Sequence, residues 1–135
     1  MSKSALYVAN TSAQSITVDG VIAPGTIIRR FGPNITLSGN AIQIVGAGYY
    51  EINASLTAEA TAAGEIIITV YKDGVPLQGA VATETAAAAG DFVNLSISAI
   101  VREFCSCCDG LSNLTFVLTG NDATITNIAI IVEKL

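Results

Sequence analysis

The chain has 135 residues, of which 51% are hydrophobic and 13% charged, and its 11 acidic and 6 basic residues give a formal net charge of −5. The charged fraction is about half that of an ordinary soluble protein, and the hydrophobic fraction excludes an intrinsically disordered chain. The acidic balance, with no basic run longer than Arg29-Arg30, argues against nucleic acid as a partner. We therefore expect one compact domain, covering residues 1–135.

The first elements in chain order are short strands separated by turn signals. Residues 4–9 are expected to form the first strand. Asp19-Gly20 predicts a small hairpin between residues 16–18 and 21–22, because an Asp-Gly pair suits the positive φ angles of a type I′ turn. The richness in isoleucine, valine and threonine favours strands over helices. Three more short strands are expected at residues 26–31, 35–37 and 41–45.

Longer strands with clear alternation follow Gly46-Ala47-Gly48. From residue 50 to residue 57, apolar and polar side chains alternate, which predicts one buried and one exposed face. The turn signal Lys72-Asp73-Gly74 predicts a connection between two further strands. The later strands are expected at residues 65–71, 75–85, 92–104, 114–118 and 123–135, which gives ten strands besides the small hairpin.

Two of these strands are apolar on both faces. They contain the runs IIITV at residues 66–70 and IAIIV at residues 128–132. In a sandwich of two sheets, one face of a strand packs in the core and the other meets solvent, so a second apolar face needs a cover. A second subunit is the simplest cover, and a roof formed by the chain's own loops is the alternative.

The features that identify a family lie along nearly the whole chain. They are an aromatic residue in the first strand, the strand start Gly48-Tyr49-Tyr50-Glu51-Ile52, the hairpin at Lys72-Asp73-Gly74, the alternating strand from Phe92 and the apolar final strand. In this order they resemble the C1q/TNF-like jelly-roll family. The texture is most similar to bacterial and phage members, including the C-terminal head domain of the collagen-like glycoprotein on the Bacillus exosporium.

The resemblance implies a fold and an assembly. The fold would be an all-β, ten-stranded antiparallel jelly-roll sandwich, and the assembly a tight homotrimer with the first and last strands along the three-fold axis. Proteins of this kind are binding or structural modules, so we expect no enzymatic activity. The residues expected at the trimer interface are Tyr7, Tyr50, Ile128, Ile130 and Val132.

Few residues offer catalytic or metal-binding chemistry. The chain has no histidine, which removes Ser-His and Cys-His nucleophile pairs and imidazole metal ligands. The carboxylates most open to acid–base work fall at strand ends or turns, where solvated acids are ordinary. We expect no catalytic residue, cofactor or metal within one chain, and an ion shared on the three-fold axis stays open. The carboxylates considered are Glu51, Glu59, Glu65, Asp73 and Asp91.

All three cysteines lie in the stretch EFCSCCDG, at residues 103–110. A tetrahedral zinc site needs four ligands, and Cys105, Cys107 and Cys108 supply three at a spacing unlike Cys-x2-Cys. We expect free thiols in a turn. A cross-link between subunits and a bridge between Cys107 and Cys108 are the alternatives.

Five Asn-x-Ser/Thr sequences are present. Residues two apart share one face of a strand, so these sequences predict a sheet face rich in hydroxyl and amide groups. Glycosylation is not expected, because the chain shows no signal-peptide core. The asparagines are Asn10, Asn34, Asn53, Asn94 and Asn113.

These observations favour a non-enzymatic structural protein. We expect a homotrimer that decorates a phage or prophage capsid or forms a fibre head, docked on a larger protein shell. The alternatives are a virion module that binds a receptor or a host-surface glycan, and a spore-surface (exosporium) protein. The chain has no run of about 18 apolar residues, so no membrane partner is expected. We expect synthesis in the cytoplasm and a final place on the virion surface, or alternatively on the spore.

Overall fold

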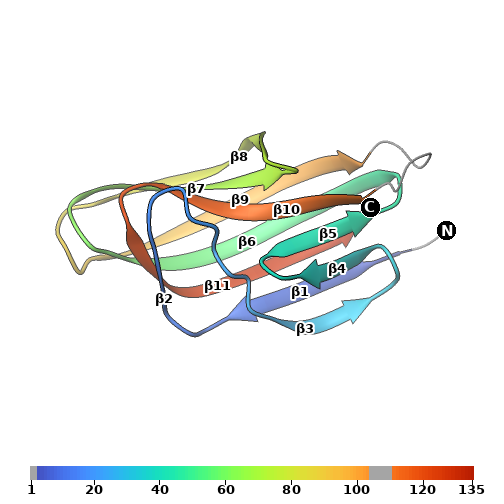
Figure 1. The fold of residues 1–135 in the computed structure, drawn as a ribbon, viewed down its shortest axis with the longest axis horizontal. Coiled ribbons are helices and arrows are strands. Elements are labelled where there is room, and N and C mark those ends of the chain that lie inside the picture. The colour runs from blue at the N-terminus through green and yellow to red at the C-terminus, as the bar shows by residue number, and fades with distance from the viewer. Residues whose placement is uncertain (1–2, 104–110) are drawn as a thin grey trace.

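The computed structural model describes residues 3–103 and 111–135, which form eleven strands and no helix (Figure 1). The predicted all-β class is therefore confirmed. One strand more than expected is present, because a three-residue strand joins one sheet. The strands are β1 (Ala5–Asn10), β2 (Gln14–Ile16), β3 (Thr26–Phe31), β4 (Ile35–Ser38), β5 (Ala41–Val45), β6 (Gly48–Ala60), β7 (Gly64–Lys72), β8 (Val75–Ala86), β9 (Phe92–Glu103), β10 (Leu111–Gly120) and β11 (Ala123–Lys134).

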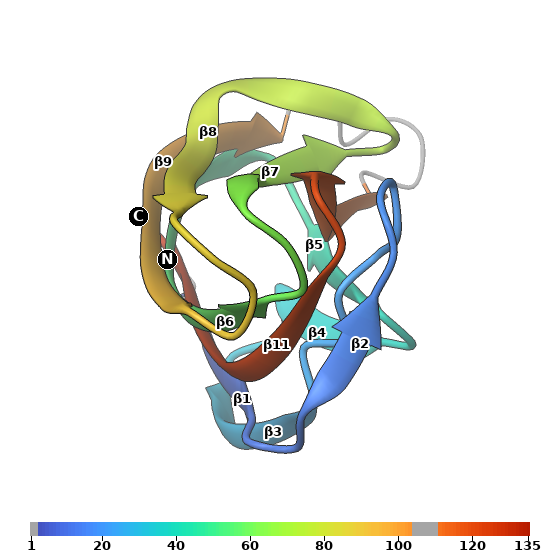
Figure 2. The ribbon, with the colours of Figure 1, turned by 90° about the vertical axis from the view of Figure 1, so that its left-hand side faces the viewer.

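The strands form two sheets that pack face to face (Figure 2). Sheet A has the order β3-β1-β11-β6-β9, with β2 paired to one end of β11. Sheet B has the order β4-β5-β10-β7-β8. All of these pairs are antiparallel, and the first strand pairs with the last. The predicted antiparallel sandwich is thereby confirmed. Among the described residues there is no helix that could span a membrane.

The hydrophobic core lies between the two sheets. In β6, the even-numbered residues from Tyr50 to Ala60 are buried, which is the alternation expected of a strand with one core face. β9 and β10 contribute in the same way, so the core is continuous across the sandwich. The largest fully buried side chains are Tyr50, Phe116, Leu6, Ile22, Ile35, Ile42, Ile44, Ile52, Leu56, Ile66, Ile68 and Leu95.

The hairpin expected around Asp19-Gly20 is wrong, although a turn is present there. Asp19 has a φ of +69°, and the Gly20 amide donates to the Thr17 carbonyl oxygen over 2.9 Å. The two arms diverge, since β2 pairs with β11 in sheet A and Val21 bridges to β10 in sheet B. Ile22 is thereby fully buried between the sheets, which removes more apolar surface from water than a small exposed hairpin would.

A register shift in β11 decides which of its residues face the core. The pairing with β6 shifts between Ile125 and Asn127. Before the shift the buried residues are odd-numbered, and after it Ile128, Ile130 and Val132 are buried. The extra residue of a β-bulge reverses the alternation along a strand. The odd-numbered residues from 127 to 133 therefore lie on the outer face of sheet A.

Candidate assembly surface

The outer face of sheet A carries large apolar side chains that no part of the described chain covers. Tyr7 of β1 is 36% exposed and Ile131 of β11 is 45% exposed, and the two are cross-strand partners. Phe31 of β3 and Ile100 of β9 lie nearer the two margins of this face and are 60% and 62% exposed. An apolar group of this kind on a sheet face is typical of a contact surface.

Small side chains make the middle of this face concave. The register places Ala9, Ala129, Ser55 and Ser96 in one row across β1, β11, β6 and β9. A depression of about 390 Å³ lies over part of this row and is bounded on one side by Tyr7. A second depression of about 210 Å³ lies beside it, and Tyr7 and Ile131 line both. The two depressions adjoin at these two side chains, and we call them together the sheet A hollow.

The middle of the β6–β9 half of the face is polar, although Tyr49, Phe92 and Ile100 are exposed toward its ends. The Ser98 hydroxyl donates to Asn53 Oδ1 over 2.8 Å, and the Thr57 hydroxyl donates to Asn94 Oδ1 over 3.0 Å. Both asparagines begin Asn-x-Ser/Thr sequences. The predicted sheet face rich in hydroxyl and amide groups is therefore confirmed for these two strands.

Two carboxylates face each other near one end of this surface. Glu51 of β6 and Glu133 of β11 are cross-strand partners on the outer face. Within the described residues, neither carboxylate forms an ion pair. Like charges directly opposite each other destabilise a sheet by a few tenths to about 1 kcal/mol. The arrangement favours a cation at this position.

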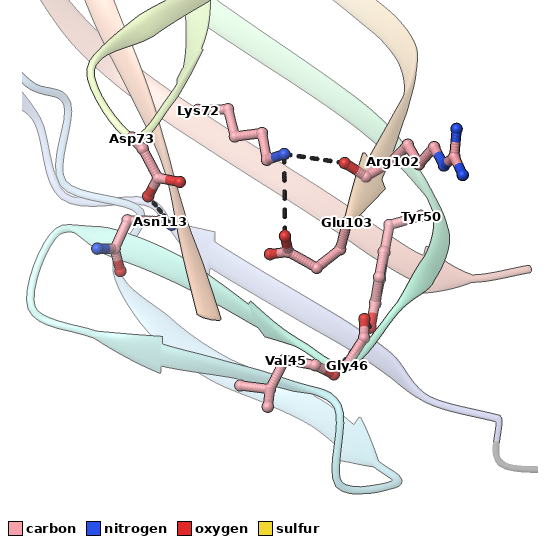
Figure 3. A network of polar contacts seen from close by, with 8 residues as sticks. All are labelled: Val45, Gly46, Tyr50, Lys72, Asp73, Arg102, Glu103 and Asn113. Atoms are coloured by element: carbon pink, nitrogen blue, oxygen red, sulfur yellow. Dashed lines mark hydrogen bonds and ion pairs between the residues drawn. The ribbon is translucent and has the colours of Figure 1, made fainter. Parts of the chain in front are cut away.

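A separate polar cluster at one end of the sandwich surrounds the Tyr50 hydroxyl (Figure 3). This hydroxyl lies 2.9 Å from the Val45 carbonyl oxygen and 2.8 Å from that of Gly46, and it donates its hydrogen to them. The Asn34 amide also donates to the Val45 oxygen, over 2.6 Å. Burial raises the pKa of Tyr50, and the nearby carboxylate of Glu103 raises it further. The hydroxyl is thus held protonated as a donor.

The same cluster fastens the end of β9 to the β7–β8 turn (Figure 3). The Lys72 ammonium donates to the Arg102 carbonyl oxygen over 2.9 Å and lies 3.9 Å from Glu103 Oε1. Asp73 Oδ1 accepts the Asn113 amide hydrogen over 2.8 Å. These bonds join strand ends to a turn, so the cluster holds the strands in alignment. The described residues contain no group of three or more His, Cys, Asp or Glu side chains that could hold a metal.

The fold can be compared with known proteins. No family model matches the chain, and no curated protein matches it. Murine APRIL (pH 5.0) has a TM-score of 0.69 and 11% identity, covering 98% of this chain and 99% of that chain. The globular domain of zebrafish complement 1qA has a TM-score of 0.67 and 9% identity, covering 97% and 95%. PRD1 vertex protein P5 has a TM-score of 0.60 and 21% identity, covering 98% and 96%.

The chain has a C1q/TNF-like jelly-roll fold. The jelly-roll fold that the family resemblance implied is therefore confirmed. These identities lie well below those at which function can be transferred, so the likeness establishes the architecture of the jelly roll alone.

The jelly roll places four of the five expected interface residues in its core. Tyr50, Ile128, Ile130 and Val132 are each 0% exposed, because sheet B already covers them. They are core residues, so the expectation that these four form a subunit contact is wrong. Tyr7 alone lies on the outer face. Sequence reasoning missed Ala129 and Ile131, since alternation does not reveal on which side of the β11 bulge a residue lies, and it also missed Phe31 of β3.

The structure locates the remaining candidates as follows. Arg29 and Arg30 point to opposite faces of β3: Arg29 pairs with Tyr7, whereas Arg30 Nε donates to the Ile35 carbonyl oxygen over 2.7 Å. Asp91 accepts the Ala88 amide hydrogen in a turn, over 3.1 Å. The thiol cluster Cys105, Cys107 and Cys108 lies outside the described residues.

Proposed function

We propose that this jelly roll is a structural protein that forms a homotrimer on the surface of a phage or prophage particle, as a capsid decoration (cement) or fibre-head protein. The observation that carries the proposal is the sheet A hollow, with Tyr7 and Ile131 exposed at its rim. Both belong to a group of large apolar side chains exposed on one sheet face, and such a group is exposed only at a cost unless a partner covers it.

A second copy of the chain is the partner that accounts best for this surface. The hollow combines an apolar half with a hydroxyl-rich half, which is the mixed composition typical of subunit contacts. The number of copies rests on the C1q/TNF-like resemblance, which implies three. A ring of three uses two different patches of each copy, and sheet A offers both a concave centre and a projecting margin.

The place on a virion is supported by the likeness to PRD1 vertex protein P5, a phage protein whose name puts it at the vertex of a particle. The absence of histidine and the structural roles of the Tyr50 and Lys72 contacts fit a protein that holds a shape. We propose accordingly that one domain covering residues 1–135 is made in the cytoplasm and ends on the virion surface. The bacterial and phage branch of the family is part of this proposal.

Light scattering on the purified chain tests the assembly directly. At micromolar concentration we expect about three times the chain mass of 13.8 kDa. A stable monomer contradicts the trimer. Co-sedimentation with the purified particle then tests the virion role, with binding expected to the parent shell. Signal on a glycan array or on host cells, without shell binding, favours a receptor-binding module, and binding to spores instead favours the exosporium alternative.

A further inference from the structure

β3 is an edge strand with one free side. It ends the strand order of sheet A and pairs with β1, and no other strand of the described chain lies beyond it (Figures 1 and 2). All of its residues are exposed, which holds for no other strand of the described chain. In a strand with one neighbour, alternate backbone N–H and C=O groups point away from the sheet. The free side of β3 is therefore able to pair with a further extended segment.

The side chains of β3 are apolar and basic on both of its faces. The register with β1 places Arg29 and Phe31 on the outer face of sheet A, and Ile27 and Arg30 on the opposite face. Phe31 is 60% exposed and Ile27 is 42% exposed. Each face of this edge strand thus presents one arginine and one large apolar side chain to a segment that pairs with it.

No carboxylate neutralises the two arginines within the described residues. β1, which pairs with β3, and β4, which packs against it, contain no aspartate or glutamate. The Arg29 guanidinium donates to the Ile28 carbonyl oxygen over 3.0 Å, and Arg30 Nε donates to that of Ile35 over 2.7 Å. Neither guanidinium forms an ion pair with any described residue. The edge therefore carries two positive charges that a carboxylate from elsewhere is able to pair with.

A second copy of the chain does not supply the matching segment. Pairing β3 with β3 of another copy would bring arginines together, and like charges opposite each other destabilise a sheet. Any other strand would need two successive acidic residues, because Arg29 and Arg30 are successive. The sequence contains no two adjacent acidic residues. The arginines thus oppose pairing between copies and select a different partner.

We propose that the free side of β3 binds an extended segment of another protein, with two successive acidic residues flanked by apolar ones, as a further strand of sheet A. The acidic residues lie opposite Arg29 and Arg30, and the apolar ones lie beside Ile27 and Phe31. Backbone hydrogen bonds supply the affinity of such an added strand, and the side-chain pairs supply its specificity.

This inference goes beyond the proposed function and does not depend on the number of copies. Arg29 and Phe31 also line the smaller depression of the sheet A hollow. The hydrogen bonds to an added strand, however, lie in the plane of the sheet. A subunit contact on the face of sheet A therefore leaves the free side of β3 available.

Two capped and labelled peptides test the charge selection on the full chain. The first has the sequence TVIEEVT, and the second, TVIKKVT, has the same length and the same apolar residues. Fluorescence anisotropy should give a dissociation constant at least about tenfold lower for the acidic peptide. Equal constants overturn the proposal.

N-methylation of the acidic peptide separates strand addition from simple ion pairing. Methyl groups on alternate backbone nitrogens remove the hydrogen-bond donors along one edge of the peptide. Of two analogues methylated on opposite edges, one should bind about tenfold or more weakly, and the other should bind like the unmethylated peptide. Two analogues that bind equally well overturn strand addition.

Charge reversal in the protein locates the contact. Arg29→Glu/Arg30→Glu should reverse the preference, so that TVIKKVT binds more tightly than TVIEEVT. Lys134→Glu makes the same kind of change on β11, two strands away from β3, and should leave the preference unchanged. Circular dichroism checks that each variant keeps its β-sheet. If the double variant fails to fold, Arg29→Glu replaces it, with an expected loss of a few fold for the acidic peptide.

A preference that persists in the reversed variant, or that Lys134→Glu also abolishes, overturns the contact with β3. A parent chain that doubles its oligomer mass with concentration and does not bind the acidic peptide assigns the edge to a second copy, which also overturns the proposal. A monomeric parent that binds the acidic peptide contradicts the proposed trimer and leaves this inference standing.

Discussion

Ile130 and Ile131 are neighbours in β11, yet Ile130 is 0% exposed in the core and Ile131 is 45% exposed beside Tyr7. The two residues have the same side chain and the same strand, so they differ only in the face that they occupy. Substituting each in turn therefore separates the stability of the fold from the stability of the assembly.

Ile131→Asp should weaken the trimer and leave the fold intact. Its side chain already meets solvent in the single chain, so the aspartate costs little there, but it would place an unpaired charge in a closed subunit contact. We expect a loss of at least about 2 kcal/mol in assembly, seen as a shift to monomer mass by light scattering. Val81→Asp is the matched control, because Val81 is 48% exposed on β8 of sheet B. Equal masses for the two variants would contradict the assignment of this surface.

Ile130→Asp should unfold the chain. A charge in the core has no partner, and the expected loss exceeds about 4 kcal/mol, a large share of the stability of a domain. The measurement is the β-sheet signal in circular dichroism during urea denaturation. A folded but monomeric Ile130→Asp chain would contradict the assignment of Ile130 to the core.

The sequence predicted most of the fold because alternation and turn chemistry act locally. Apart from the small hairpin, each of the ten expected strands is present within a few residues, and residues 41–45 match β5 at both ends. In β6 and β9 the predicted core faces are the buried ones, since no bulge interrupts either strand in its pairing with the other. A period of two then determines which side chains are covered.

The features that the sequence did not predict depend on pairing between residues that are distant along the chain. In β11 every residue from 128 to 132 is apolar, so hydrophobicity does not distinguish its two faces, and the bulge after Ile125 determines which of them meets the core. The turn at Asp19-Gly20 was visible, but Ile16 pairs with Ala123 and Val21 bridges to Val117, and both partners lie far away along the chain. The sheet A hollow arises from the register of four strands, which no local signal contains.

Gly25 is a position at which the fold requires glycine. Its φ is +97°, and an added Cβ would collide with the Ala9 carbonyl oxygen of β1. Gly25→Ala should cost about 3 kcal/mol, from the strained backbone and the forced shift together. Gly74→Ala is the control, because Gly74 has a φ of +82° with open space around it, and should cost about 1 kcal/mol. Urea denaturation gives the loss of unfolding free energy in each variant. Equal losses would show that the contact with Ala9 does not add to the cost of Gly25→Ala.

Tyr50→Phe should destabilise the jelly roll by about 1 to 2 kcal/mol at neutral pH, because it removes the donor to the Val45 and Gly46 carbonyl oxygens and leaves the packing of the ring unchanged. The stability of the parent chain should also depend on this hydroxyl at high pH. Burial and the Glu103 carboxylate raise the pKa of Tyr50 in the folded chain, whereas the unfolded chain has the ordinary value near 10.

The sign of this effect follows from which state keeps its proton. Below about pH 10 the hydroxyl is protonated in both states, so its full contribution is present. As the pH rises from there through the folded pKa, the unfolded chain releases its proton first, and the contribution is lost. The difference in unfolding free energy between the parent and Tyr50→Phe should therefore shrink as the pH increases above about 10. Denaturation curves at pH 7, 9, 10 and 11 measure this difference. If the unfolding free energy of both proteins falls equally with pH, the alkaline effect comes from groups other than Tyr50.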